Sequence, residues 1–166
     1  MRNLFVRHLQ TMYDGEMVMA DALTAMSRSA LPGALQNFYR RKAEEHLRTM
    51  HELNRVFRLL RTESKGECDT IIRSVVAGVD PNAVNEEDAI RVALALSGRA
   101  LSVYEVSAYS TAVSCAMDLG EMEVAAIINK CLEEKKFNRA NIEFLVEQDQ
   151  LRMVREEFSF RENQVA

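Results

Sequence analysis

The chain has 166 residues and a formal net charge of −4, and it contains 6 glycines, 2 prolines and no tryptophan. This length fits one domain with a substantial core, and the abundance of Ala, Leu, Met, Glu and Arg favours helix over sheet. Basic and acidic side chains are mixed along the sequence, so no basic face stands out for nucleic acid, and no apolar run is long enough to span a membrane.

The N-terminus and the cysteines indicate the compartment. The opening MRNLFVRHLQTMYDGE carries charges where a signal peptide needs an apolar run, which predicts a cytoplasmic protein. The cysteines are odd in number and have no CxxC spacing. We therefore expect buried free thiols rather than disulfides or a zinc site.

The first predicted helix runs from about Leu4 to Ser27 and contains one acid, Glu16, within its apolar stripe. Tyr13 lies one turn before Glu16 and is a candidate hydrogen-bond donor to it. A short break follows at Ser29 to Gly33, which predicts that the next helix is an antiparallel neighbour. The apolar positions of the stripe are Leu9, Met12, Met19, Leu23 and Met26.

The second predicted helix spans about Pro32 to Arg61, and its inward face contains Glu45. Its segment RRKAEEHLRTMHE is typical of a solvated face. His46 follows Glu45 directly but lies about 100° further around the helix, so we do not expect the two to bind one ligand together. The apolar positions of this face are Leu35, Phe38, Leu53 and Val56.

The helical periodicity breaks between Thr62 and Val84. Loop signals at residues 64–66 and 80–82 flank a short apolar run, which predicts a connection containing a short helix. A connection of this length is what a crossover along a bundle requires, and it makes the second and third long helices parallel.

The third predicted helix begins at Asn85, which precedes three acids that complement a helix N-terminus, and ends near Asp118. Gly120 is the expected left-handed residue at its end. Glu105 lies at the middle of a face of small and apolar residues. The other members of that face are Leu94, Gly98, Leu101, Ala108 and Ala112.

The fourth predicted helix begins near Glu121, after a tight turn, and continues to about Gln148. Its inward face contains Glu134, together with Val124, Ile127, Cys131, Asn138 and Leu145. Residues 1–148 are thus predicted to form one four-helix bundle, followed by a tail, 149–166. Exposed Phe158 and Phe160 in that tail would indicate a subunit contact; a fraying terminus with a small docking patch is the other interpretation.

One glutamate near the middle of each helix places four carboxylates at one level of the bundle. Facing each other in a low-dielectric core, they would cost several kcal/mol each unless metal, protons or basic side chains neutralised them. A pair of metal ions bridged by carboxylates is a common solution in helical bundles.

Three motifs, MYDGE, YEVSAY and CLEEK, carry a resemblance to a known family. The segment from Tyr104 to Leu145 resembles the second half of the YciE/YciF family of bacterial ferritin-like, stress-associated proteins. Residues 4–26 share that family's layout, and residues 35–57 are a looser match. The resemblance implies a ferritin-like four-helix bundle, commonly a homodimer, with a carboxylate metal site. The acids that match the family's are Glu16, Glu45, Glu105 and Glu134.

The sequence also departs from the family pattern at four positions around this site. Ser102 replaces an acid one turn before Glu105, and Thr49 replaces a frequent histidine. Lys135 replaces the third acid of the family's LEEEK motif, and Arg139 replaces an aspartate. Lys42 and Lys135 are both placed to reach the centre of the bundle.

Two functions of different classes follow from these observations. In the first, the four glutamates bind iron or manganese, and the metal catalyses ferroxidase-like or peroxide-handling chemistry. In the second, Lys or Arg neutralises the acids, and the protein is a non-catalytic structural or interaction partner. A helical adaptor unrelated to ferritins ranks last, because it leaves the four central glutamates unexplained.

Overall fold

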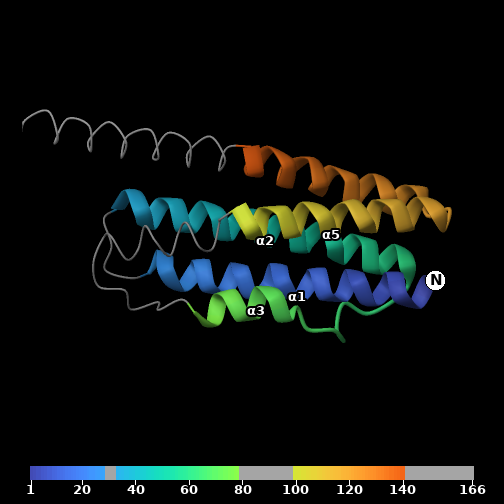
Figure 1. Cartoon of the computed structure of the whole chain (residues 1–166), viewed down its shortest axis with the longest axis horizontal. Helices are drawn as coiled ribbons and strands as arrows, with labels where there is room; N and C mark the ends of the chain where they lie inside the picture. Colours follow the sequence, from blue (N-terminus) through green and yellow to red (C-terminus); the bar gives the residue numbers. More distant parts are fainter. Residues whose placement is uncertain (29–32, 79–98, 141–166) are drawn as a thin grey trace, which may run out of the picture.

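The chain forms a bundle of long helices, seen here in a computed structural model that describes residues 1–28, 33–78 and 99–140 (Figure 1). The long helices are α1 (Arg2–Ser27), α2 (Gly33–Leu60), α5 (Arg99–Asp118) and a last helix over residues 122–140. The short helix α3 (Thr70–Ala77) lies beside α1. The predicted all-α helical bundle is confirmed.

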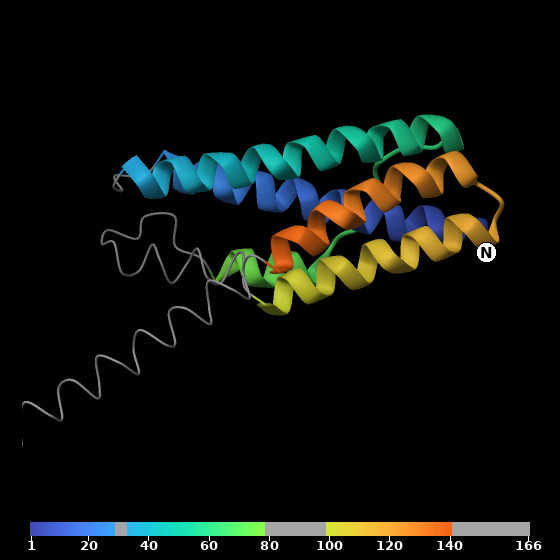
Figure 2. The same ribbon diagram turned by 90° about the horizontal axis from the view of Figure 1, so that it is seen from above.

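The direction of the helices confirms the predicted crossover. Figures 1 and 2 show α2 and α5 running in one direction, while α1 and the helix 122–140 run in the other. The short helix predicted in the connection after α2 is α3. Gly120 has φ +73°, so the left-handed turn between the last two helices is also confirmed. The predicted helix start at Asn85, the break at Pro32 and the tail 149–166 lie outside the described residues.

The core consists of two apolar clusters separated by a polar layer. All five predicted stripe residues of α1 are buried, Leu9 and Met12 in one cluster and Met19, Leu23 and Met26 in the other. Glu16 lies between these two groups on α1 and is itself 3% exposed. The polar layer therefore crosses the middle of the bundle, as the sequence predicts.

On α2 and on the last helix, the predicted inward positions Leu53, Val56, Val124 and Cys131 are buried. At the polar layer, however, the predicted inward residue of each helix is wrong by one position. On α2 the buried side chain is His46, and Glu45 is half-buried. On the last helix the buried side chain is Lys135, and Glu134 is exposed. One residue is a rotation of about 100°, so this small difference in register exchanges a buried side chain for its neighbour.

A second cluster of polar contacts holds α3 against the bundle. Asp69 caps α3 by accepting a hydrogen bond from the Ile72 amide at 2.9 Å, and its other oxygen accepts one from the Tyr104 hydroxyl at 2.8 Å. Asp14 accepts the Asp69 amide at 2.8 Å and also pairs with Arg73. These contacts join α1, α3 and α5.

The described part of the chain contains no helix that is both long and apolar enough to cross a membrane. Its three cysteines are free thiols, of which Cys131 is buried, Cys115 is partly buried and Cys68 is exposed. The expectation of free thiols is confirmed, and the expectation that all are buried is wrong for Cys68. Burial raises the pKa of the Cys131 thiol to about 12, with the nearby Glu134, Glu16 and Glu52 carboxylates adding to the shift, so this cysteine stays protonated.

Candidate functional site

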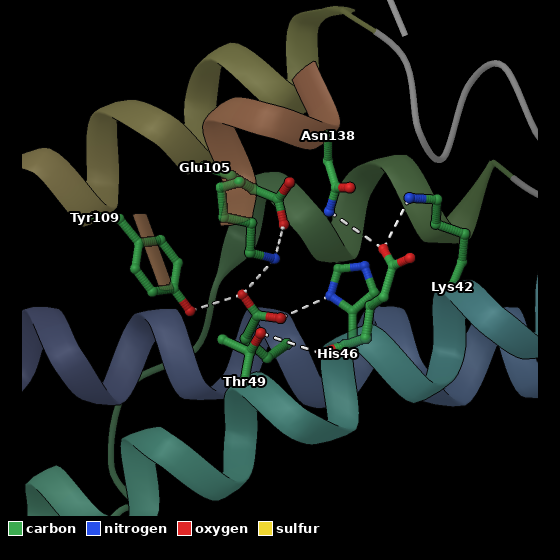
Figure 3. Close-up of polar contacts among 9 residues, drawn as sticks. Lys42, His46, Thr49, Glu105, Tyr109 and Asn138 are labelled. Atoms are coloured by element: carbon green, nitrogen blue, oxygen red, sulfur yellow. Dashed lines mark hydrogen bonds and ion pairs between the residues drawn. The ribbon is translucent and has the colours of Figure 1, made fainter. Parts of the chain in front are cut away.

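Glu16 is the centre of the polar layer, and three other helices supply its partners. Its Oε1 accepts a hydrogen bond from the Tyr109 hydroxyl of α5 at 2.8 Å. The same oxygen lies 2.8 Å from Nζ of Lys135 on the last helix. Its Oε2 lies 2.6 Å from Nδ1 of His46 on α2. The carboxylate is thus fully enclosed by charged and polar donors (Figure 3).

Lys135 joins two of the four predicted site residues. Its Nζ lies 2.6 Å from Oε1 of Glu105 as well as 2.8 Å from Oε1 of Glu16. The lysine side chain is 8% exposed, and its ammonium lies 5.7 Å from the centre of the Tyr109 ring, within range of a cation–π contact. A single buried cation therefore bridges two carboxylates.

The ionisation states of this pair follow from their contact. Burial alone would raise the pKa of Glu16, but the Lys135 ammonium and His46 together lower the pKa to about 2. Burial alone would lower the pKa of Lys135, but Glu105 and Glu16 hold it above its usual value. Both groups are therefore charged at neutral pH.

Tyr109 remains a neutral donor to this charged pair. Burial and the neighbouring Glu16 carboxylate raise the pKa of its hydroxyl well above the usual value. Tyr13, the donor expected from the sequence, makes no hydrogen bond to Glu16. Its hydroxyl accepts a hydrogen bond from Asn54 at 3.2 Å, and its ring packs edge-on against Phe57.

The other two predicted site residues lie further out. Glu45 is held by Lys42, with Nζ at 2.8 Å, and by the Asn138 amide at 3.2 Å. Glu134 is exposed, and no hydrogen bond or ion pair joins it to any other residue in the described part of the chain. Glu16 and Glu105 are thus brought together, whereas Glu45 and Glu134 do not join them in one cluster.

A cavity of about 50 Å³ links these outer residues with the centre. That volume is large enough for a few water molecules. Its lining comes from α1, α2, α5 and the last helix. The polar members of the lining are Lys42, Glu45, His46, Thr49, Ser102, Glu105, Glu134, Lys135 and Asn138.

The side chains as arranged do not fit a pair of bridged metal ions. Three possible ligand residues, Glu16, His46 and Glu105, offer atoms within 4.8 Å of one another, which is the spacing that one ion requires. However, the Lys135 ammonium stands between Glu16 and Glu105, where a bridged ion would have to lie. A di-metal centre in helical bundles uses four carboxylates and two histidines, whereas within residues 1–28, 33–78 and 99–140 three such residues cluster.

A four-helix bundle with one long crossover connection has the topology of ferritin-like folds. The structure is similar to that of the Escherichia coli stress protein YciF, with a TM-score of 0.73 and 18% sequence identity, over 87% of this chain and 92% of that one. It is also similar to YcfI from Rhodopseudomonas palustris, with a TM-score of 0.71 and 22% identity, over 86% and 92% of the two chains. The sequence matches none of the curated proteins.

A family model described as a domain of unknown function, DUF892, matches residues 1–154. The chain therefore belongs to this family, and the resemblance to the YciE/YciF proteins is confirmed. The low identity to the two solved structures establishes the shared fold alone.

The sequence did not predict the roles of two residues of the site, His46 and Tyr109. His46 was considered only as a possible partner of Glu45 and not as an inward residue, and the aromatic donor was expected to be Tyr13 rather than Tyr109. A signal for Lys135 was present, because it replaces the third acid of the family's LEEEK motif. The signal for Tyr109 was its place one helical turn after Glu105, in a segment with few charges.

Proposed function

We propose that this chain is a non-catalytic member of its ferritin-like, stress-associated family, in which Lys135 neutralises the central carboxylates in place of a di-metal centre. The protein then acts as a structural or interaction partner, as a homodimer, and not as an oxidase. The observation that carries the proposal is the pair of contacts from one buried ammonium, at 2.8 Å to Glu16 and 2.6 Å to Glu105.

The charge of the site supports this assignment. A di-metal centre needs several anionic ligands to offset four positive charges, whereas one ammonium already offsets one of the two inner carboxylates. Lys42 offsets Glu45 in the same way, through an ion pair at 2.8 Å. The ligands that a second metal ion would use are therefore engaged with lysines.

The competing function is redox catalysis by iron or manganese bound to Glu16, Glu45, Glu105 and Glu134. The cluster of Glu16, His46 and Glu105 favours some metal affinity, so this alternative needs a direct test. It requires Lys135 to leave the space between the two inner carboxylates.

The rate at which the protein oxidises iron(II) in air distinguishes between these two functions. We expect the untagged protein, loaded anaerobically with iron(II), to oxidise it no faster than buffer with an inert protein of equal concentration. Light scattering coupled to gel filtration should give twice the chain mass of 18.9 kDa. Catalysed oxidation with two iron ions retained per chain would contradict the proposal.

A further inference from the structure

The short helix α3 is attached to the bundle mainly by polar contacts. Of its eight residues Ile72 is the buried one, and the partly buried Val75 and Val76 pack against the same apolar cluster. Each long helix, in contrast, contributes several buried apolar side chains to the core. A helix that buries so little apolar surface detaches at a lower free energy than the whole bundle unfolds.

The first point of attachment is Asp14 of α1. Its carboxylate accepts hydrogen bonds from the Asp69 amide at 2.8 Å and from Nε of Arg73 at 2.9 Å, and it also forms an ion pair with the Arg73 guanidinium. The Asp14 side chain is 12% exposed, whereas that of Arg73 is 45% exposed. Water can therefore reach the guanidinium and replace the carboxylate as its partner.

The second point of attachment is Tyr104 of α5. Its hydroxyl donates a hydrogen bond to Oδ2 of Asp69 at 2.8 Å, while Oδ1 of Asp69 caps α3 by accepting the Ile72 amide at 2.9 Å. Asp69 thus contacts α1 through its amide and α5 through its carboxylate. Because one residue carries the cap and both attachments, we expect α3 to leave the bundle as a unit.

A small cavity separates α3 from the polar layer of the bundle. Figure 2 shows α3 in the space between α1 and α5, in agreement with the contacts of Asp69. Asp69 and Ile72 line the cavity from the side of α3, and Glu16, Glu105 and Tyr109 line it from the side of the polar layer. Its volume of about 20 Å³ is that of roughly one water molecule. Removal of α3 would open this cavity to solvent.

The connection before α3 is anchored to α1 and then offers a hinge. The Gln10 side-chain amide donates hydrogen bonds to the carbonyl oxygens of Glu63 at 3.0 Å and Lys65 at 2.6 Å. Gly66 follows with φ +145°, a conformation that favours glycine. Glu67 makes an exposed ion pair with α1, and such pairs contribute little to stability. The chain after the anchor is therefore free to turn about Gly66.

We propose that α3 is a lid that opens as a unit about Gly66 while the long helices stay folded, and that its opening gives water access to the polar layer. The ion pair between Asp14 and Arg73 is the latch. In the closed form the lid keeps water from the Tyr109 side of Glu16. The proposal does not depend on the proposed function, since neither the neutralisation by lysine nor the dimer enters it.

Hydrogen exchange of the full-length protein at increasing urea concentrations tests the separate opening. Amides of residues 73–77 should exchange on the order of 100-fold faster than those of the buried residues Leu9 and Val56. Their rates should also depend little on urea below the unfolding transition, because opening a lid exposes little surface. Core amides should become much faster as urea rises.

Arg73→Met tests the latch. It should accelerate exchange of residues 73–77 by roughly 10- to 100-fold, the factor that hydrogen bonds to a charged group contribute, and leave the core amides unchanged. Arg55→Met is the matched control. Arg55 is 47% exposed and pairs with Glu52 within α2, so its replacement should leave the exchange of α3 unchanged.

The hydroxyl proton of Tyr109, observed by NMR in its hydrogen bond to Glu16, reports whether the lid covers the polar layer. In Arg73→Met its exchange with water should accelerate by the same factor as the amides of α3. Tyr104→Phe, which removes the second attachment, should accelerate both signals as well and keeps the test decisive if Arg73→Met does not fold.

Three results would overturn the inference. The first is exchange of α3 with the same rate and urea dependence as the core, which would show that α3 has no opening of its own. The second is unchanged exchange of α3 in both variants. The third is faster exchange of α3 with an unchanged Tyr109 hydroxyl, which would show that α3 frays without covering the polar layer. The proposed function would stand in all three cases.

Discussion

Nζ of Lys135 lies 2.8 Å from Oε1 of Glu16, and both side chains are at least nine-tenths buried. The stability of the folded protein is more sensitive to the loss of one member of a buried ion pair than to the loss of one member of a surface pair. Removing one partner leaves the other as an uncompensated buried charge, which is where the cost arises. This relationship is the basis of the first two predictions.

Lys135→Met should destabilise the protein by about 3–5 kcal/mol, because Glu16 and Glu105 would then face each other without a cation. The control is Lys136→Met, which removes an exposed lysine that pairs with Glu133 and should cost less than about 1 kcal/mol. Urea unfolding of both variants at neutral pH measures the difference. Equal midpoints would show that Lys135 is not the cation on which the centre depends.

The low pKa of Glu16 predicts loss of stability in acid. Because the folded-state pKa, about 2, lies below the usual glutamate value of about 4.3, the contribution is fully present above pH 4.3 and is lost as the pH falls toward 2. Unfolding free energies measured between pH 6 and pH 2.5 should therefore fall more steeply for the unmodified protein than for Glu16→Gln. The same slope in both would contradict the assigned charge state, and Glu133→Gln, at an exposed position, should not change the slope.

The sequence correctly predicted the fold and two of the residues at the centre of the bundle, Glu16 and Glu105. The apolar residues of α1 follow one unambiguous stripe, so the acid within it, Glu16, could only face inward. On the last helix both Ile127 and Ile128 are apolar, and steps of three and four from Val124 reach either Glu134 or Lys135. Periodicity cannot distinguish these two registers, and a lysine is ordinarily assigned to the surface.

The same ambiguity explains the error on α2. The segment around Glu45 and His46 is rich in charged residues, and it contains few apolar residues that would indicate which face of the helix is buried. What selects His46 is its tertiary contact with Glu16, 30 residues earlier in the chain, which no local pattern encodes.

Tyr109→Phe should destabilise the protein by about 1.5–3 kcal/mol, since it removes a hydrogen bond to a charged, buried carboxylate. Tyr13→Phe is the matched control, because it removes a longer, neutral hydrogen bond at 3.2 Å and should cost about 0.5–1.5 kcal/mol. Chemical unfolding gives both values. A smaller loss for Tyr109→Phe than for Tyr13→Phe would contradict the central role of the Glu16 carboxylate.

Gly15→Ala should loosen α3. A Cβ at this position would lie 2.9 Å from Oδ2 of Asp69 and 3.3 Å from Cγ1 of Ile72, so the carboxylate that caps α3 must shift, at a cost of about 1–3 kcal/mol. Hydrogen exchange should quicken across residues 70–77. Gly78→Ala is the control, because Gly78 has φ −82° and a new Cβ there meets nothing closer than 3.4 Å. Unchanged exchange in Gly15→Ala would contradict the close approach of α1 and α3.

The most direct test of the central claim is a crystal structure of the protein grown anaerobically with excess iron(II), with anomalous scattering recorded at the iron edge. The account predicts Lys135 Nζ between Glu16 and Glu105, and no pair of iron peaks at that position. Two anomalous peaks about 3.5–4 Å apart, bridged by these carboxylates with the lysine turned away, would contradict it.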